Sequence, residues 1–570
     1  MTHPEPLTAR IPTPIDGVAE AWVDTLCALD PDVAVWIGRE GSDGFADLSP
    51  EGHARTNDEA RATLRALRDC SPVDAVDAVT QADLAADLQL QLDSAEAGLW
   101  MRDLNVIASP AQGIRDTFDL MPTASEHDWE RIAAKLHHVP DALAGYAETL
   151  RAGVRAGSTP ALRQIVTVAE QAARTAAVDG FFPTFAENAS LSHDAAAAGG
   201  SLPDALRAHL SAGAESARAA YAEFSRFLTE ELAPAGNPED AIGRDHYALL
   251  SQSFLGARID LDETYEWGRS ELERMIAEQE RIADEISPGA SVHEVVALLE
   301  ADERHSLQGT AALQEWMQQI SEEAITALDG THFDIPAPVR TIECLIAPTQ
   351  EGGIYYTSPS DDFSRPGRMW WSVPEGVTRF DTWREKTTVY HEGFPGHHLQ
   401  LGQAVFNRDT LNTWRRQLAG TSGHAEGWAL YAERLMEELG FLADPADRFG
   451  MLDAQRMRAA RVVLDLGVHL NKPRLDGTGT WDYDYAFEFM KANVNMSEPF
   501  VRFEVDRYFG WPGQAPSYKV GQRIWEDLRD EMRRTEGSLF DIRQFHKRAL
   551  DLGGVGLDTL RAAVRGTLAR

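Results

Sequence analysis

The sequence predicts a mainly α-helical protein of two lobes with one small β region. Three observations lead to this prediction. The chain has 570 residues, enough to bury a large core and long for one compact unit. Apolar residues recur at intervals of three and four along most of it, with good helix formers between them. One stretch, residues 335–377, breaks this pattern with frequent prolines, glycines and β-forming clusters.

The helical periodicity is clearest in three segments, residues 83–99, 203–228 and 261–286. Stretches rich in glycine and proline interrupt it at residues 199–200, 233–240 and 287–291. We place a division at the second of these breaks. It gives an N-terminal helical lobe, residues 1–235, and a second helical lobe, residues 236–570, that contains the β region. We expect the two lobes to form one continuous fold unit.

The β region contains three clusters of β-branched and aromatic residues: VRTIECLIAP (339–348), GGIYYTSP (352–359) and RMWWSVP (368–374). We expect a small sheet or hairpin here, with its strands closing one side of a cleft. Helix resumes at residues 380–392, where Asp381 is the predicted N-cap. The remainder is expected to be helical apart from loops at residues 471–481 and 511–516.

Composition excludes several classes of function. The chain has 53 Lys and Arg against 90 Asp and Glu, a net charge of −37 that would repel nucleic acid and anionic membranes. No stretch reaches the roughly 18 apolar residues of a membrane span, and the N-terminus shows no secretory signal pattern. The three cysteines lie far apart, which predicts neither a disulfide framework nor a cysteine metal site. We therefore expect a cytoplasmic protein with neither nucleic-acid nor membrane partners.

Two segments stand out chemically: YHEGFPGHHLQ (390–400) and GHAEGWALYAE (423–433), both in a helical context. Zinc in a catalytic site takes three imidazole or carboxylate ligands at roughly 2 Å and keeps the fourth position for water. Two histidines and an adjacent glutamate on one helix, with a carboxylate from a second helix, meet this requirement. The sequence therefore predicts a site for one zinc ion built from these two segments.

His391 and His397 are the favoured histidine ligands, although they lie six residues apart. On a straight helix this spacing would separate them by about 9 Å along the axis. Pro395 removes an amide that would bond to the carbonyl of His391, and the flanking glycines allow unusual backbone angles. We therefore expect the helix to bulge here and bring the two histidines together.

Alternatives remain for the other positions. His398 rivals the second histidine because it lies on the same helix face as the first, two turns away. Glu426 and Glu433 lie seven residues apart on one helix face, and we favour Glu426 as the ligand. His424 is then expected to lie in the cleft or behind the ligands. Glu392 is the predicted general base, placed to deprotonate the water at the fourth position.

At these residues the chain resembles a bacterial family of uncharacterised proteins whose signature is HExxPGHHLQ followed by EGWALYAE. The resemblance covers most of the chain and continues in AIGRDHYALL (241–250), DLDETYEWG (260–268), RAARVVLDLGVH (458–469) and EVDRYFGWPGQAPSYKVGQ (504–522). That family is similar in fold to Taq-type metallocarboxypeptidases and, more distantly, to thimet oligopeptidase and angiotensin-converting enzyme. All of these are mainly helical gluzincins with a deep cleft.

The resemblance implies that two histidines and a downstream glutamate bind one zinc ion, which corresponds to His391, His397 and Glu426. It implies a zinc-dependent hydrolase of peptide bonds, a carboxypeptidase or dipeptidase-like enzyme on short peptides. Two alternatives are a metallohydrolase of a non-peptide amide or conjugate and a helical metal-binding protein without turnover. A homodimer is compatible with each of them.

Other residues are candidates for binding the substrate. Gluzincins commonly use a later Tyr or His to stabilise the oxyanion, and Tyr518 is our candidate for this catalytic role. Lys519 beside it is expected to face solvent. Tyr356 is expected to line the cleft from an edge strand that could pair with an extended peptide. His398 and His424 are further candidates there.

A second set of candidates lies on one helix. Arg458, Arg461, Asp465 and His469 recur at intervals of three and four, so they form a stripe on one helix face. In a cleft, such a stripe could bind a substrate carboxylate through its guanidinium groups. Buried structural ion pairs explain the pattern equally well. Arg507 is a further candidate for the same role.

Overall fold

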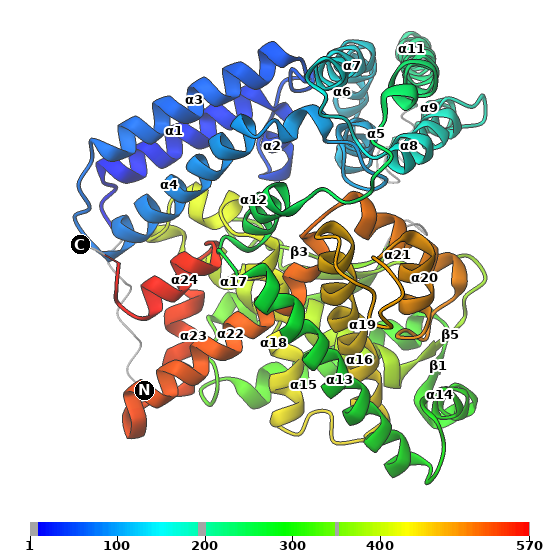
Figure 1. Ribbon diagram of the computed structural model, residues 1–570. Helices are drawn as coiled ribbons and strands as arrows, with labels where there is room; N and C mark the ends of the chain where they lie inside the picture. The colour runs from blue at the N-terminus through cyan, green and yellow to red at the C-terminus, as the bar shows by residue number, and fades with distance from the viewer. Residues whose placement is uncertain (1–9, 192–200, 348–352, 569–570) are drawn as a thin grey trace.

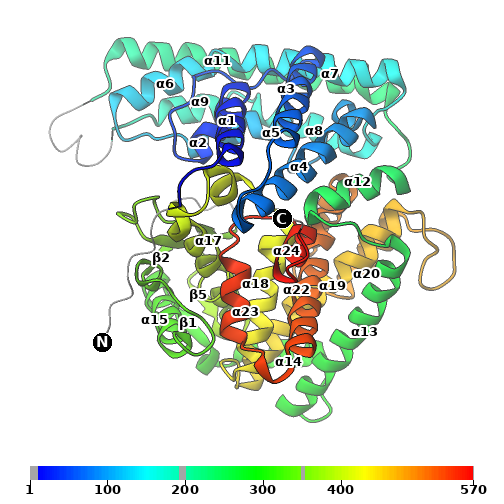
Figure 2. The same cartoon turned by 90° about the vertical axis from the view of Figure 1, so that its left-hand side faces the viewer.

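The computed structural model describes residues 10–191, 201–347 and 353–568, and it is mainly helical, as predicted. The N-terminal helices form a layer above a larger second lobe (Figure 1). The same layer crosses the top of the molecule in the view turned by 90° (Figure 2). Among the described helices, none combines the length and apolar character that a bilayer span needs.

The helices of the N-terminal layer are α1 (Pro14–Leu29), α2 (Pro31–Trp36), α3 (Pro50–Arg68), α4 (Ala75–Glu96), α5 (Pro110–Leu120), α6 (Glu126–Leu136), α7 (Val139–Ala156), α8 (Leu162–Thr175), α9 (Phe181–Glu187) and α11 (Asp204–Phe227). The helix predicted at residues 83–99 corresponds to α4 and the turn that follows it, and the one at residues 203–228 corresponds to α11. Serine, threonine or aspartate caps several of these helices, as at α1, where Thr13 and Asp16 form a reciprocal capping box.

The helices of the second lobe are α12 (Arg244–Leu255), α13 (Leu261–Ile286), α14 (Val292–Ala301), α15 (Thr310–Leu328), α16 (Thr382–Glu392), α17 (His397–Phe406), α18 (Ser422–Glu438), α19 (Pro445–His469), α20 (Tyr483–Lys491), α21 (Glu498–Gly510), α22 (Gln514–Glu536), α23 (Ile542–Leu550) and α24 (Leu557–Val564). The helix predicted at residues 261–286 is α13. Helix α16 begins after Asp381 as predicted, although the Asp381 carboxylate makes no capping hydrogen bond.

Strands β2, β3 and β4 lie within the predicted β region, residues 335–377, whereas β1 and β5 lie outside it. Strands β2 (Ile342–Ile346), β4 (Gly367–Trp371) and β3 (Ile354–Thr357) form a sheet in that order, with β2 parallel and β3 antiparallel to β4. Strand β1 (Ser306–Gln308) pairs with β5 (Arg379–Asp381) in a separate antiparallel ribbon that leads into α16. β3 is thus an edge strand of the larger sheet.

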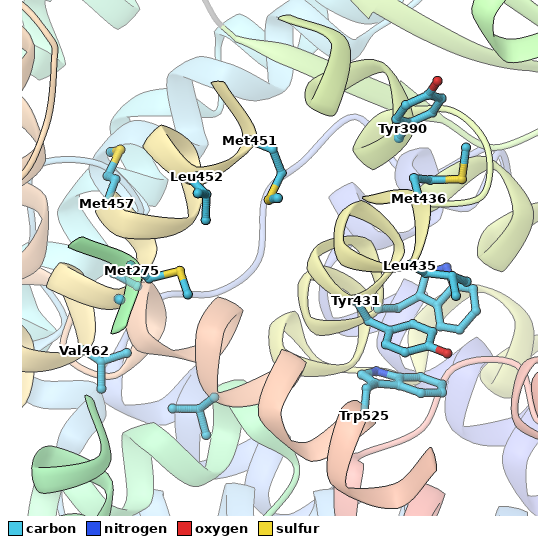
Figure 3. Packing of buried hydrophobic residues seen from close by; sticks show 14 of the residues in the cluster. Met275, Tyr390, Tyr431, Leu435, Met436, Met451, Leu452, Met457, Val462 and Trp525 are labelled. Atoms are coloured by element: carbon cyan, nitrogen blue, oxygen red, sulfur yellow. The ribbon is translucent and has the colours of Figure 1, made fainter. Parts of the chain in front are cut away.

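Three apolar clusters form the core. One packs residues 104–232 of the N-terminal layer, and a second packs α1, α3 and α4 around Trp22 together with Trp414 of the second lobe. The largest cluster draws on residues 247–564 and on Val79. Figure 3 shows part of this cluster, where Tyr431 of α18 lies beside Trp525 of α22. This core holds α16, α18, α19 and α22 in fixed positions, and these helices carry most of the candidate residues.

Candidate metal centre

The two histidines of YHEGFPGHHLQ lie side by side because the helix that carries them is interrupted. Helix α16 ends at Glu392, residues 393–396 leave the helical path with a cis peptide bond between Phe394 and Pro395, and α17 begins at His397. The imidazole rings of His391 and His397 are nearly perpendicular, at 87°, with centroids 5.0 Å apart. The bulge expected within one helix is therefore a break between two helices.

The connection between these helices depends on a glycine and on a buried tryptophan. The backbone N–H of Gly396 donates to the carbonyl of Tyr390 at 3.0 Å. A Cβ atom on Gly396 would overlap the carbonyl oxygen of His391, so no larger residue fits there. The buried indole N–H of Trp428 donates to the carbonyls of Pro395 and Gly396 at 2.9 and 3.1 Å. The carbonyl of Gly396 also accepts from the backbone N–H of Gln400 at 3.2 Å, so the indole matters most for the carbonyl of Pro395, which lies outside both helices.

Helix α18 presents one carboxylate to each ring nitrogen of His391. Glu426 Oε2 lies 3.1 Å from Nε2 of His391 and 3.7 Å from Nε2 of His397. Glu433 Oε1 lies 2.8 Å from Nδ1 of His391. The Glu433 side chain is 1% exposed, whereas that of Glu426 is 22% exposed. Glu426 therefore lies on the accessible side of the imidazoles, and Glu433 is sealed behind one of them.

Glu392 belongs to the same cluster. His391, Glu392 and His397 each offer an atom that could bind a metal ion, and these three atoms lie within 4.8 Å of one another. In the part of the chain that the structure describes, no other three His, Cys, Asp or Glu side chains lie so close together. Burial raises the pKa of Glu392, and the two histidines oppose this rise. These three side chains and Glu426 thus place two imidazoles and two carboxylates around one small volume.

The charges in this volume depend on each other. Burial lowers the pKa of His391, but hydrogen bonds with Glu426 and Glu433 outweigh it and raise the pKa to about 10. Burial raises the pKa of Glu426, but hydrogen bonds with both histidines outweigh it and hold the pKa well below its usual range. The cluster therefore favours a positive charge between the imidazoles and the carboxylate of Glu426.

Helices α18 and α22 are in backbone contact, and this brings Tyr518 close to Glu426. A Cβ atom on Gly427 would lie 2.7 Å from the Cα of Gly521, so the two helices pack directly through glycines. Burial and the charge of Glu426 raise the pKa of Tyr518 to about 12. The guanidinium carbon of Arg461 lies 5.4 Å from the centre of the Tyr518 ring. Tyr518 is thus a neutral hydroxyl near the cluster.

His398 points away from the cluster. Its Nε2 bonds to the carbonyl of Val339 at 2.7 Å, so its Nδ1 accepts from the hydroxyl of Tyr356, 2.9 Å away. Burial lowers the pKa of His398 to about 4, in keeping with a neutral ring. Both ring nitrogens are therefore occupied, and Tyr356 of β3 holds this histidine against the sheet.

Most of the polar stripe on α19 is paired internally. Arg461 donates to Glu504 and to the hydroxyl of Tyr508 at 2.8 and 2.6 Å. His469 bonds to the carbonyl of Tyr508 at 2.8 Å. Arg507 of α21 donates to Glu504 and to Gln514. For these residues the structure shows buried structural pairing, the alternative to substrate binding that the sequence pattern left open.

Arg458 differs from its neighbours in this stripe. Its Nε is buried without a hydrogen-bond partner, and Arg458 forms no salt bridge among the residues that the structure describes. Burial raises the pKa of Glu392 and of Tyr518, and the positive charge of Arg458 opposes both shifts. It is thus a guanidinium near the cluster that no described carboxylate neutralises by direct contact.

Several buried polar residues near the cluster were missed or misplaced from the sequence. Lys519 was expected to face solvent but is 1% exposed, because the face of α22 that carries it packs against α19. His424 is buried, with its Nδ1 3.4 Å from the amide nitrogen of Gln400. Gln400 and Gln455 were not singled out. Both residues lie within or near the quoted motifs, but a glutamine in a sequence does not indicate which residue its side chain will bond.

A family model of bacterial proteins of unknown function, DUF885, matches residues 31–564, and the chain belongs to this family. The comparison with curated proteins found no match. A candidate lipoprotein from Colwellia psychrerythraea shares the fold, with a TM-score of 0.83 and 22% identity over 98% of this chain and 100% of that one. A candidate lipoprotein of unknown function from Shewanella oneidensis has a TM-score of 0.73 and 18% identity over 96% and 98%.

A carboxypeptidase from Pyrococcus furiosus aligns over 99% of this chain and 100% of its own, with 11% identity and a TM-score of 0.41. That score is too low to carry an argument about shared fold or activity. The membership of a family of uncharacterised proteins is confirmed, whereas the likeness to the helical carboxypeptidases stays weak.

The prediction of a cytoplasmic location is contradicted by the two candidate lipoproteins that share the fold. That prediction used the scarcity of cysteine as a sign of a reducing compartment. A core as large as this one needs no disulfide bonds, so three cysteines indicate nothing about the compartment.

Proposed function

We propose that this member of the DUF885 family is a zinc-dependent hydrolase of peptide bonds, a carboxypeptidase or dipeptidase-like enzyme that acts on short peptides. The observation that carries the proposal is the arrangement of His391, His397 and Glu426, with Glu392 in the same cluster. Three ligand-type side chains with a separate glutamate beside them match the donor set of a catalytic zinc site.

The donor chemistry of His391 fits a bound cation. Its Nδ1 faces the buried carboxylate of Glu433, which only accepts hydrogen bonds when ionised, so the ring proton belongs at Nδ1. The Nε2 then directs a lone pair at the carboxylate of Glu426, 3.1 Å away. Two acceptors at this distance repel each other unless a proton or a metal ion lies between them. We assign Nε2 of His391, Nε2 of His397 and the carboxylate of Glu426 as the ligands.

Zinc, when bound, supplies a Lewis acid that polarises a carbonyl group and makes water more acidic. Glu392 accepts the proton of the attacking water and returns it to the leaving nitrogen. Burial raises the pKa of the Glu392 carboxyl, which suits a group that must both accept and release a proton. Tyr518 donates its hydroxyl hydrogen to the oxyanion, which suits a phenol that stays protonated because its pKa is about 12. Arg458 is the candidate partner for a substrate carboxylate.

The test is mass-spectrometric profiling of a short-peptide library with free and amidated C-termini. Zinc-loaded protein, chelated protein and Glu392→Gln are compared. We expect cleavage only by the zinc-loaded wild type, while Glu392→Gln retains one zinc per chain. Glu385→Gln is the matched control, because Glu385 is a carboxyl with a burial-raised pKa on the same helix, outside the cluster. It should cleave like the wild type.

The outcomes separate the alternatives. Loss of cleavage on amidation supports a carboxypeptidase. No cleavage by protein that holds one zinc rejects the peptidase and favours hydrolysis of a non-peptide amide or conjugate. A fourth protein ligand on the ion would favour a metal-binding protein without turnover, because a structural site closes its fourth position.

A further inference from the structure

A chain of buried polar side chains leads from His391 to a lysine on another helix. Glu433 Oε1 faces Nδ1 of His391 at 2.8 Å, and Glu433 Oε2 accepts from the amide nitrogen of Gln455 at 3.0 Å. The amide oxygen of Gln455 accepts from Nζ of Lys519 at 2.6 Å. All four side chains are buried. These buried hydrogen bonds thus connect α16, α18, α19 and α22.

Lys519 makes three hydrogen bonds, which match the three protons of its ammonium group. Besides Gln455, it contacts Gln522 Oε1 at 2.9 Å and Glu271 Oε1 at 3.0 Å. Burial raises the pKa of Glu271, but the cations of Arg274 and Lys519 outweigh it and lower the pKa to about 2. An ammonium donates and never accepts, so each partner must turn an oxygen toward it.

This requirement fixes the direction of every bond in the chain. Because the Gln455 oxygen faces Lys519, its NH2 group faces Glu433 and donates to it. An ionised Glu433 then accepts at both oxygens, from Gln455 at Oε2 and from His391 at Oε1, so His391 carries a proton on Nδ1. In the neutral ring, the form that binds a metal ion, the lone pair of His391 then lies on Nε2, toward Glu426. Without Lys519 the Gln455 amide could turn over, and its oxygen would then face the Glu433 carboxylate.

We infer that Lys519 is a positioning residue that, through Gln455 and Glu433, sets His391 as a metal ligand by holding its free lone pair at Nε2. The inference rests on the proposed metal site, and it extends that site to a residue on α22. Neighbouring groups that support a histidine ligand typically alter metal affinity by about ten- to a hundredfold.

Gln522 supplies a matched control for Gln455. Gln455 and Gln522 both accept from Lys519, but the Gln522 amide donates to Glu526, away from the site. If losing any acceptor of Lys519 weakened zinc binding, substituting Gln455 and substituting Gln522 would weaken it equally. If the amide of Gln455 orients His391 through Glu433, only the substitution of Gln455 would weaken zinc binding. Gln455→Met and Gln522→Met therefore remove equal groups on two different branches.

The experiment titrates Zn²⁺ into the full-length apo-protein against a chromophoric chelator, with thermal unfolding to verify that each variant folds. We expect about ten- to a hundredfold weaker zinc binding in Lys519→Met and Gln455→Met, and wild-type binding in Gln522→Met. The double variant of Lys519 and Gln455 should bind no worse than the weaker single variant, because both act through Glu433. The absorption spectrum of bound Co²⁺ should change in the same two single variants.

Zinc binding within twofold of the wild type in folded Lys519→Met and Gln455→Met would overturn this inference and leave the metal site intact. Equal losses in Gln455→Met and Gln522→Met would also overturn it, since they indicate a merely structural role. A wild type that binds no zinc overturns both the inference and the proposed function.

Discussion

The contact between α18 and α22 gives the sharpest test of how the site is held together. In Gly427→Ala the new Cβ would lie 2.7 Å from the Cα of Gly521 and closer still to its carbonyl carbon, whereas ordinary contact begins at 3.4 Å. The contact with the carbonyl carbon, at 2.4 Å, is short by 3.4 − 2.4 = 1.0 Å, and the helices must separate to relieve it because backbone atoms cannot rotate away. Overpacking of this kind costs about 1–3 kcal/mol, against about 1 kcal/mol that alanine gains in helix propensity.

We therefore expect Gly427→Ala to lower the free energy of unfolding by about 1 kcal/mol, the overpacking cost less the gain in helix propensity, measured by urea denaturation. It should also weaken zinc binding, since the adjacent Glu426 moves with the helix. Gly113→Ala in α5 is the control: an added Cβ meets nothing within 4 Å there, so stability should rise slightly. Unfolding energy in Gly427→Ala equal to or above the wild type would refute the reasoning.

Three further predictions concern other parts of the account. Trp428→Phe leaves the carbonyl of Pro395 without its buried donor, so urea denaturation should show a loss of about 2 kcal/mol in the free energy of unfolding. Zinc titration should show a weaker affinity, and unchanged values in both experiments would contradict the role of the indole. His398→Gln should keep one zinc per chain by elemental analysis while His397→Gln loses it, and the reverse result would exchange their roles. Burial raises the pKa of Asp465 from 3.8 to about 7, so the folded chain retains a proton that the unfolded chain releases, and stability falls by up to about 4 kcal/mol as pH rises from about 4 to 7. Thermal melting of Asp465→Asn should therefore depend less on pH over this range than that of the wild type; equal slopes would reject the shift.

The sequence was sufficient for the helical class and for the residues that meet at the cluster. Its apolar periodicity is a local property, and α13 begins and ends at the predicted residues. The pairing of His391 with His397 could be anticipated because Pro395 and two glycines stand between them. How the chain departs from helix there could not, because the break depends on Trp428, a residue of another helix.

Roles decided by long-range pairing were beyond the sequence. The stripe on α19 gave equal support to substrate binding and to ion pairing, and the structure pairs Arg461 with Glu504 of α21. Lys519 looked like a surface residue because its acceptors come from other helices as well as its own. Orientation of an amide such as Gln455 is likewise invisible until both of its neighbours are known.

The central claim is that one ion is held by two histidines and a glutamate, with one position open. The most direct measurement is an anomalous difference map at the zinc edge from crystals of the zinc-loaded protein. The account predicts a single peak with ligands at roughly 2.0–2.2 Å from His391, His397 and Glu426 and with no fourth protein ligand. A peak elsewhere, or one closed by a further side chain, would contradict it.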